Sequence, residues 1–151
     1  MIELERPADL ARYVGKEIGV SDWLTVDQAI IDKFAEATGD HQWIHVDVER
    51  AKREMPDGKT IAHGYLTLSL VPRLAQTIYR VKKRSRGLNY GSNRIRFTGQ
   101  VPAGSRIRLH QKIKSVEPVE GGVRITSEST VEVEGAERPA LVAETISMQF
   151  D

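Results

Sequence analysis

The chain has 151 residues, which is enough for one domain with a hydrophobic core. Hydrophobic residues make up 40% and charged residues 28%, the balance of a soluble globular protein, and the absence of cysteine excludes disulfides, thiolate catalysis and cysteine-ligated zinc. Twenty-two Lys and Arg against 21 Asp and Glu give a net charge of +1, so bulk charge does not indicate a nucleic-acid partner.

The chain carries no pattern of a membrane anchor or a secretory signal. No apolar run approaches the ~20 residues of a membrane helix. The first residues, MIELERPADLARYV, contain acidic side chains and lack an apolar signal core. We find no internal repeat or linker. We therefore expect a single domain over residues 1–151, located in the cytoplasm and without a membrane partner.

The first predicted elements are a strand over residues 17–25 and a helix over residues 26–38. Thr25 followed three places later by Gln28 is a capping-box pattern, which predicts where the helix begins. Gly39 is suited to the left-handed conformation that ends many helices.

The next segments lead to a second, more apolar helix. Residues 40–47, DHQWIHVD, have neither a helical nor a strand period, and residues 48–55 indicate one or two helical turns. Residues 65–81 are apolar around most of a helix, which predicts a helix buried on several sides. Pro72 is expected to cost an internal hydrogen bond there and to kink the helix.

A basic cluster follows this predicted helix, formed by Lys82, Lys83, Arg84 and Arg86. One interpretation is a solvated helix end, where cations favour the negative pole of the helix dipole. The other is a contact for an anionic ligand, such as the phosphates of coenzyme A. The cluster alone leaves both open.

The second half of the chain alternates with period two, which predicts strands. Apolar residues recur at alternate positions from Ile107 to Ile113, from Val123 to Val133 and from Val142 to Phe150. Glycine-containing turns separate these runs, and the segment LNYGSNRIRF precedes them as a further strand. A strand, two helices and then four strands predict an α+β fold in which a mostly antiparallel sheet covers the apolar helix.

The residues best suited to chemistry are Asp40 and His45. Asp40 follows a helix end and His45 comes five residues later, so both side chains can reach one cleft. A carboxylate beside an imidazole can activate water near neutral pH. The alternatives are an Asp that caps the next turn and a structural loop His. A metal site is not expected, because the HExxH pattern is missing.

Other catalytic patterns are missing from the sequence. No serine lies in a GxSxG elbow, and there is no GxGxxG or P-loop pattern, so no nucleotide cofactor is expected. His110 lies on the polar face of a predicted strand and is expected to be solvated.

Three separated blocks resemble the MaoC-like, (R)-specific enoyl-CoA hydratase family of hotdog proteins. The family signature is Gly-Asp-x-Asn-Pro-aliphatic-His, then five residues and a small one. The matching positions here are Gly39, Asp40, Ile44, His45 and Ala51. The segments IAHGYLTLSL and IRFTGQVPAGSRI resemble the later His-Gly and strand-turn blocks, and the order agrees from about residue 17 onward.

The chain departs from the family pattern at Gln42 and Trp43, which stand where Asn and Pro are usual. Gln42 still offers an amide, on a side chain one methylene longer, and Trp43 adds bulk near the site. These changes bear on substrate size more than on reaction type. In this respect the chain most resembles the mycobacterial-type, nodulation-protein-N-like branch of the family.

The resemblance implies a single hotdog domain: a curved antiparallel sheet around a long central helix, with an extra helix and an overhanging loop that carry the site. It implies that Asp40 and His45 activate water for reversible hydration of a trans-2-enoyl thioester of CoA or acyl-carrier protein. The Gly64 N–H would bind the thioester oxygen, since Gly64 lies at the predicted start of the central helix. His63 would either assist substrate binding as a hydrogen-bond donor or be a packed structural histidine, Gln42 would assist substrate binding, and no cofactor is implied.

Three rival functions stay open. A hotdog thioesterase commonly carries its carboxylate on the central helix, and residues 65–76 contain no Asp or Glu. A non-catalytic acyl-thioester-binding protein would be expected to lose Asp40 or His45, and both are present. A protein-interaction domain would need an exposed apolar stripe. A homodimer joined through sheet edges is also expected, because a hotdog domain otherwise exposes a strand edge.

Overall fold

The computed structural model describes all residues, 1–151. Its helices are a 3₁₀ helix η1 (Pro7–Tyr13), α1 (Gln28–Thr38), α2 (Trp43–Val46), α3 (Val48–Glu54) and α4 (Gly64–Ala75). Its strands are β1 (Ile2–Leu4), β2 (Glu17–Val20), β3 (Leu24–Val26), β4 (Tyr79–Val81), β5 (Arg86–Arg96), β6 (Ser105–Val119), β7 (Gly122–Val133) and β8 (Leu141–Phe150). None of the helices combines the length and apolar character needed to cross a membrane.

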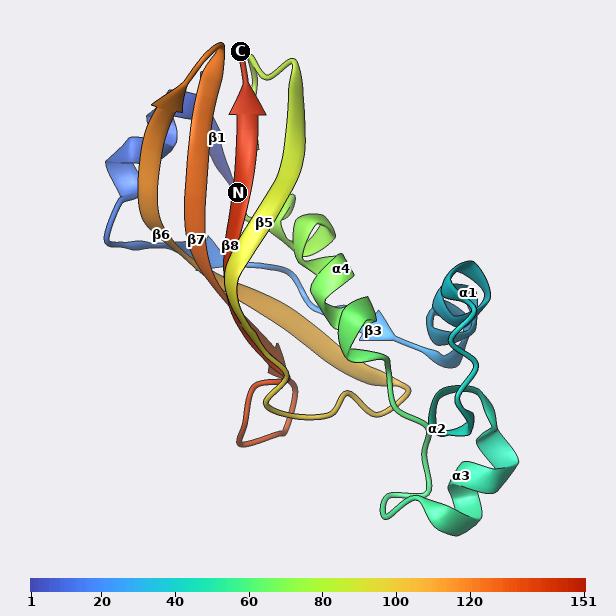
Figure 1. Cartoon of the computed structure of the whole chain (residues 1–151). Helices are drawn as coiled ribbons and strands as arrows, with labels where there is room; N and C mark the ends of the chain where they lie inside the picture. The colour runs from blue at the N-terminus through green and yellow to red at the C-terminus, as the bar shows by residue number, and fades with distance from the viewer.

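The main sheet is antiparallel and has the order β2-β6-β7-β8-β5, with β3 also paired to β6. Its long strands bend past α4, while α1, α2 and α3 lie together away from the sheet (Figure 1). Buried residues of α4, such as Leu66 and Leu74, join inward residues of the sheet, such as Ile107 and Leu141, in one core cluster. The predicted hotdog arrangement, a sheet around a buried helix, is confirmed.

The predicted turns are also confirmed. Gly121 has φ 78° and Gly135 has φ 79°, backbone conformations that glycine adopts without a steric penalty. These two residues lie in the β6–β7 and β7–β8 connections. The turns place the three strands next to one another, so that their inward faces line up over α4.

The prediction of a helix over residues 65–81 is wrong at its end. α4 stops at Ala75, three residues after Pro72, and the chain turns into β4. β4 pairs in parallel with β1, with Tyr79 opposite Ile2. This pairing uses residues more than 70 positions apart, so no local period could reveal it. The basic cluster therefore does not lie at a helix end, and the Lys82 ammonium instead lies 3.5 Å from Glu5.

Two further details differ from the predictions for the N-terminal half. Residues 17–25 form two short strands, β2 and β3, rather than one. The N-cap of α1 is Asp27, whose carboxylate accepts a 2.9 Å hydrogen bond from the Ile30 N–H, and not Thr25. The segment predicted to be irregular contains the short helix α2, which holds His45.

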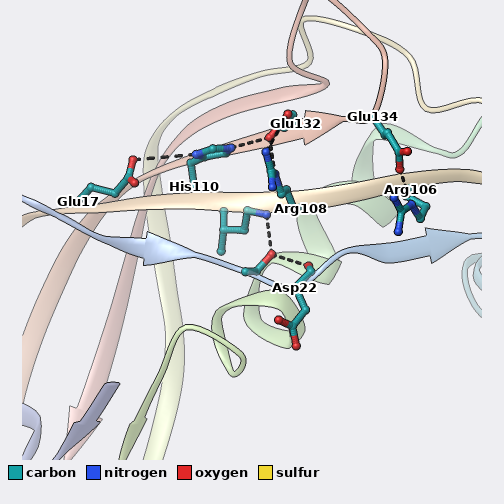
Figure 2. A network of polar contacts seen from close by, with 9 residues as sticks. Glu17, Asp22, Arg106, Arg108, His110, Glu132 and Glu134 are labelled. Carbon is teal, nitrogen blue, oxygen red and sulfur yellow. Dashed lines mark hydrogen bonds and ion pairs between the residues drawn. The ribbon is translucent and has the colours of Figure 1, made fainter. Parts of the chain in front are cut away.

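His110 lies on the outer face of the sheet in a charged network (Figure 2). Its Nε2 is 2.7 Å from the Glu132 carboxylate, and 33% of its side chain is exposed, so it is only partly solvated. The hydrogen bond from Arg108 lowers the pKa of Glu132, and the bond from His110 adds to this. The network links β6 to β7, and His110 lines neither the cavity beside His45 nor the cavity between α4 and the sheet, which supports a structural role for His110.

Candidate active site

The candidate site lies where the helices beside the sheet meet the start of α4. Gly39 ends α1 with φ 77°, and its N–H donates to the Ala35 carbonyl at 2.8 Å. This turn sets Asp40 directly after the helix, and α2 begins three residues later and carries His45. The chain then returns through α3 to His63, the N-cap residue of α4.

Gln28, at the start of α1, holds these segments together. Its Nε2 donates to the His45 carbonyl at 2.8 Å, and its Oε1 accepts a hydrogen bond from the Thr60 hydroxyl. The Ile61 N–H also donates to the Ile44 carbonyl at 3.0 Å. The side chain that the sequence assigned to a capping box therefore fixes α2 against the segment before α4.

Asp40, His45 and His63 form one cluster. A carboxylate oxygen of Asp40 and one ring nitrogen from each histidine all lie within 4.8 Å of one another. His45 and His63 are 7% and 3% exposed, while Asp40 is exposed. The structure thus brings together Asp40 and His45, the predicted catalytic residues, and His63, a predicted substrate-binding residue.

The hydrogen bonding of His45 determines which ring nitrogen can act as a base. Its Nδ1 lies 2.6 Å from the Ile61 carbonyl oxygen, which can only accept a hydrogen bond. The proton of neutral His45 therefore sits on Nδ1, and Nε2 keeps a free lone pair. Burial lowers the pKa of His45; the Ile61 bond and Asp40 oppose this shift and His63 adds to it. His45 is thus a neutral base near pH 7.

His63 contacts both Asp40 and His45. Its Nε2 donates to the backbone carbonyl of Asp40 at 3.0 Å, which holds the segment after α1 against the start of α4. Its ring stacks on His45 with centroids 3.8 Å apart and an angle of 22°, and Phe34 packs at 4.9 Å. Its buried Nδ1 has no hydrogen-bond partner in the protein.

The cluster is better arranged for water than for a metal ion. A ligating imidazole nitrogen directs its lone pair within the ring plane, and the two rings are stacked with centroids 3.8 Å apart and an angle of 22° between their planes. Lone pairs in two stacked rings do not converge on one ion. A water molecule needs only two or three hydrogen-bond partners within reach, and the Asp40 carboxylate and the free Nε2 of His45 can provide two of them.

A cavity of about 330 Å³ extends from His45 along the first turn of α4. Gly64, Thr67 and Phe97 also line it. The Gly64 N–H donates to no acceptor in the protein, because it is at the first position of α4 and His63 provides no side-chain cap. The predicted donor thus lies at a helix N-terminus, where the dipole favours a negative charge.

Gln42 does not line this cavity, and neither do Asp40 and His63. Gln42 is exposed and is the N-cap residue of α2, and its side chain makes no capping hydrogen bond. Sequence reasoning missed Phe97, whose ring lies against Gly64, and the carbonyl of Ile61. The only signal for Phe97 in the sequence is an aromatic residue at the end of the predicted strand LNYGSNRIRF.

Comparisons with known proteins identify the family of the chain. A family model described as a MaoC like domain matches residues 9–135. The chain is 50% identical over 147 residues to 3-hydroxyacyl-thioester dehydratase Z of Mycobacterium tuberculosis, covering 97% of each chain. It is 46% identical to Nodulation protein N of Rhizobium leguminosarum bv. viciae, over 95% of this chain and 91% of that protein. The fold matches a MaoC-like dehydratase from Rhodospirillum rubrum with TM-score 0.72 and 22% identity, over 95% of this chain and 94% of that one.

Proposed function

Because the chain belongs to the MaoC-like domain family, we propose that this hydro-lyase is an (R)-specific enoyl-CoA hydratase. It would interconvert a trans-2-enoyl thioester and a (3R)-hydroxyacyl thioester. The name of the 50% identical relative, a 3-hydroxyacyl-thioester dehydratase, supports the reaction class. The observation that carries the proposal is the clustering of the Asp40 carboxylate with His45, whose Nε2 is free, where His45 and Gly64 line the same cavity.

The proposed reaction uses these groups as follows. A water molecule held by Asp40 and His45 attacks the β carbon of the enoyl group while His45 Nε2 takes one of its protons. The electron pair of the carbon–carbon double bond shifts toward the thioester and gives an enolate, whose oxygen the Gly64 N–H stabilises. Asp40 and His45 then return a proton to the α carbon on the same face. One hydroxyl and one proton are added in total, and the enzyme returns to its starting state.

A thioesterase is the second candidate, and the structure gives it less support. α4 contains no Asp or Glu, and the carboxylate of the cluster comes instead from the segment after α1. The stereochemistry of the product tests the proposal. Crotonyl-CoA is incubated with the protein, and the product is offered to (3R)- and (3S)-specific 3-hydroxyacyl-CoA dehydrogenases. We expect oxidation by the (3R)-specific enzyme only; a (3S) product would contradict the proposal.

The acid limb of the pH profile provides another test. The kcat/KM of the free enzyme should fall as His45 becomes protonated, because the imidazolium cannot accept a proton from water. Burial lowers the pKa of His45 below its ordinary value of 6.5, so activity should persist at pH 6.5 and decline only below it. A limb centred above pH 6.5 in crotonyl-CoA hydration would argue against His45 as the base.

We also propose that the protein is a homodimer joined through β5. This edge strand of 11 residues is exposed along nearly its whole length, and Leu88 and Tyr90 are 51% and 58% exposed. A long exposed edge with apolar side chains favours pairing with a second chain. The acyl substrate would then lie near the subunit interface.

Sedimentation tests this assembly. We expect a dimer for the wild-type protein and a shift toward monomer for Leu88→Arg, which places a charge on the β5 edge. Val48→Arg is the matched control, because Val48 is an exposed apolar residue on α3, far from β5 in sequence. A stable and active wild-type monomer would rule out the dimer.

A further inference from the structure

A second and larger cavity, of about 820 Å³, lies between α4 and the sheet. On the α4 side its lining is mostly apolar and begins one turn after Gly64. On the sheet side β6 and β7 contribute polar residues, while β5 and β8 contribute both polar and apolar ones, such as Leu88 and Met148. The residues that set this contrast are Leu68, Val71, Pro72 and Ala75 of α4, and Gln111, Ser127, Thr145 and Gln149 of β6, β7 and β8.

The polar residues interrupt the apolar inner face of the sheet. In β6 the inward series runs Ile107, Leu109, Gln111, Ile113, so a glutamine stands where an aliphatic side chain would continue the core. Ser129 lies opposite Gln111 on β7, and Thr145 lies opposite Ser127 on β8. The polar patch thus crosses three neighbouring strands. Burying polar groups reduces stability unless they find partners, so this patch needs a reason.

Hydrogen bonds within the patch leave two acceptors without partners. Gln111 Nε2 donates to the Ser129 hydroxyl at 3.3 Å, and Gln149 Nε2 donates to the Tyr79 hydroxyl at 3.2 Å. The Oε1 atoms of both glutamines are buried and have no partner. Gln111 and Gln149 are 6% and 4% exposed, and both line the cavity. Such groups are nearly always paired in proteins, which points to a ligand that supplies the missing hydrogen bonds.

We propose that this cavity binds the distal part of the acyl chain and selects substrates that carry a hydroxyl group there. The inference rests on the proposed hydration of enoyl thioesters. A hydroxyl both donates and accepts, so it satisfies a glutamine whichever end of the amide faces the cavity. The only charged residue in the lining is Arg84, which is exposed, so the buried part suits a neutral polar group.

The position of the cavity sets where the hydroxyl should be. Gly64, the proposed thioester contact, and Pro72, in the lining, are eight residues apart on α4, or ~12 Å along the helix axis. The apolar residues of α4 can contact the methylene groups between these points. The hydroxyl should therefore lie well along the acyl chain and not beside the reacting carbons.

A matched pair of substrates tests the proposal. Wild-type hydration is measured with trans-2-decenoyl-CoA and with its ω-hydroxy derivative, alongside crotonyl-CoA, whose acyl group is too short to reach the polar patch. We expect kcat/KM to favour the hydroxylated chain by roughly 10- to 100-fold, since the apolar chain leaves buried polar groups unpaired. Equal values, or a preference for the apolar chain, would overturn the selectivity proposal.

The same assay separates this inference from the proposed function. Hydration of crotonyl-CoA without a preference within the pair would overturn only the selectivity proposal. No hydration of any of the three substrates would overturn the proposed function as well. The comparison uses only wild-type protein, so it does not depend on whether any variant folds.

Variants identify the residues responsible. Gln111→Leu and Gln149→Leu keep the side-chain size but remove the amides, and we expect each to lower the preference for the hydroxylated chain at least 5- to 10-fold, in line with the loss of a hydrogen bond. Thr130→Val is the control, because Thr130 lies on β7 next to Ser129 and does not line the cavity. An unchanged preference in both Leu variants would overturn the assignment, as would a dimer structure in which partner side chains pair with both amides.

Discussion

Replacing Asp40 with Asn or His45 with Gln should lower kcat/KM for crotonyl-CoA hydration by ~10²–10⁴-fold, the usual contribution of positioned proton transfer. Both variants should fold. Asp40 is exposed, and a glutamine at position 45 can still donate a hydrogen bond to the Ile61 carbonyl that His45 contacts. Steady-state assays of enoyl thioester loss measure the change in kcat/KM, and circular dichroism checks the fold.

The two substitutions should not be additive, because both groups act on one water molecule. The double variant is therefore expected to be about as slow as the slower single variant. His110→Gln is the matched control, since it makes the same change on the outer face of the sheet and should keep most of the activity. If either site variant keeps more than about a tenth of the wild-type rate, that residue is not part of the acid/base pair.

The Gly64 donor is expected to have the second largest effect. Gly64→Val keeps the N–H but should block the approach of the thioester oxygen, and we expect a loss of ~10²-fold in rate, roughly 3 kcal/mol, as for loss of one oxyanion donor. The structure adds a second consequence. A Cβ atom at Gly64 would lie 3.0 Å from the ring of Phe97, so the ring must move aside.

A double-mutant cycle separates these two effects. Phe97→Ala removes the ring that the valine would meet, and Gly64→Val is then measured in that background. If blocked approach is the cause, valine should still reduce kcat/KM ~10²-fold when Phe97 is absent. If valine has no further effect in the Phe97→Ala background, the loss came from displacing Phe97, and the oxyanion assignment to Gly64 is wrong.

Much of the site could be predicted because its residues are close in sequence and lie at helix boundaries. Gly39 can end a helix in the left-handed conformation, so the position of Asp40 followed from one residue type. The start of α4 at Gly64 followed from the His-Gly block and the apolar run after it. Apolar residues at alternate positions in the second half mark the buried face of each strand. This alternation predicted β6, β7 and β8.

The remaining features depend on contacts between distant residues. The carbonyl that fixes the His45 tautomer belongs to Ile61, 16 positions away, and a backbone atom leaves no trace in residue type. The β1–β4 pairing also joins distant residues, so the sequence did not reveal that the helix ends before β4. Gln111 and Gln149 look like ordinary strand residues until the fold brings both to one cavity beneath α4.

The most direct test of the account is the reaction of the wild-type protein with crotonyl-CoA. The absorbance of the enoyl thioester and the release of free thiol are measured at the same time. We expect the absorbance to fall without release of thiol, because water adds to the double bond and leaves the thioester intact. Thiol release at the rate of substrate loss would instead indicate a thioesterase. If folded protein shows neither a fall in absorbance nor release of thiol, the assignment of Asp40 and His45 to water addition is contradicted.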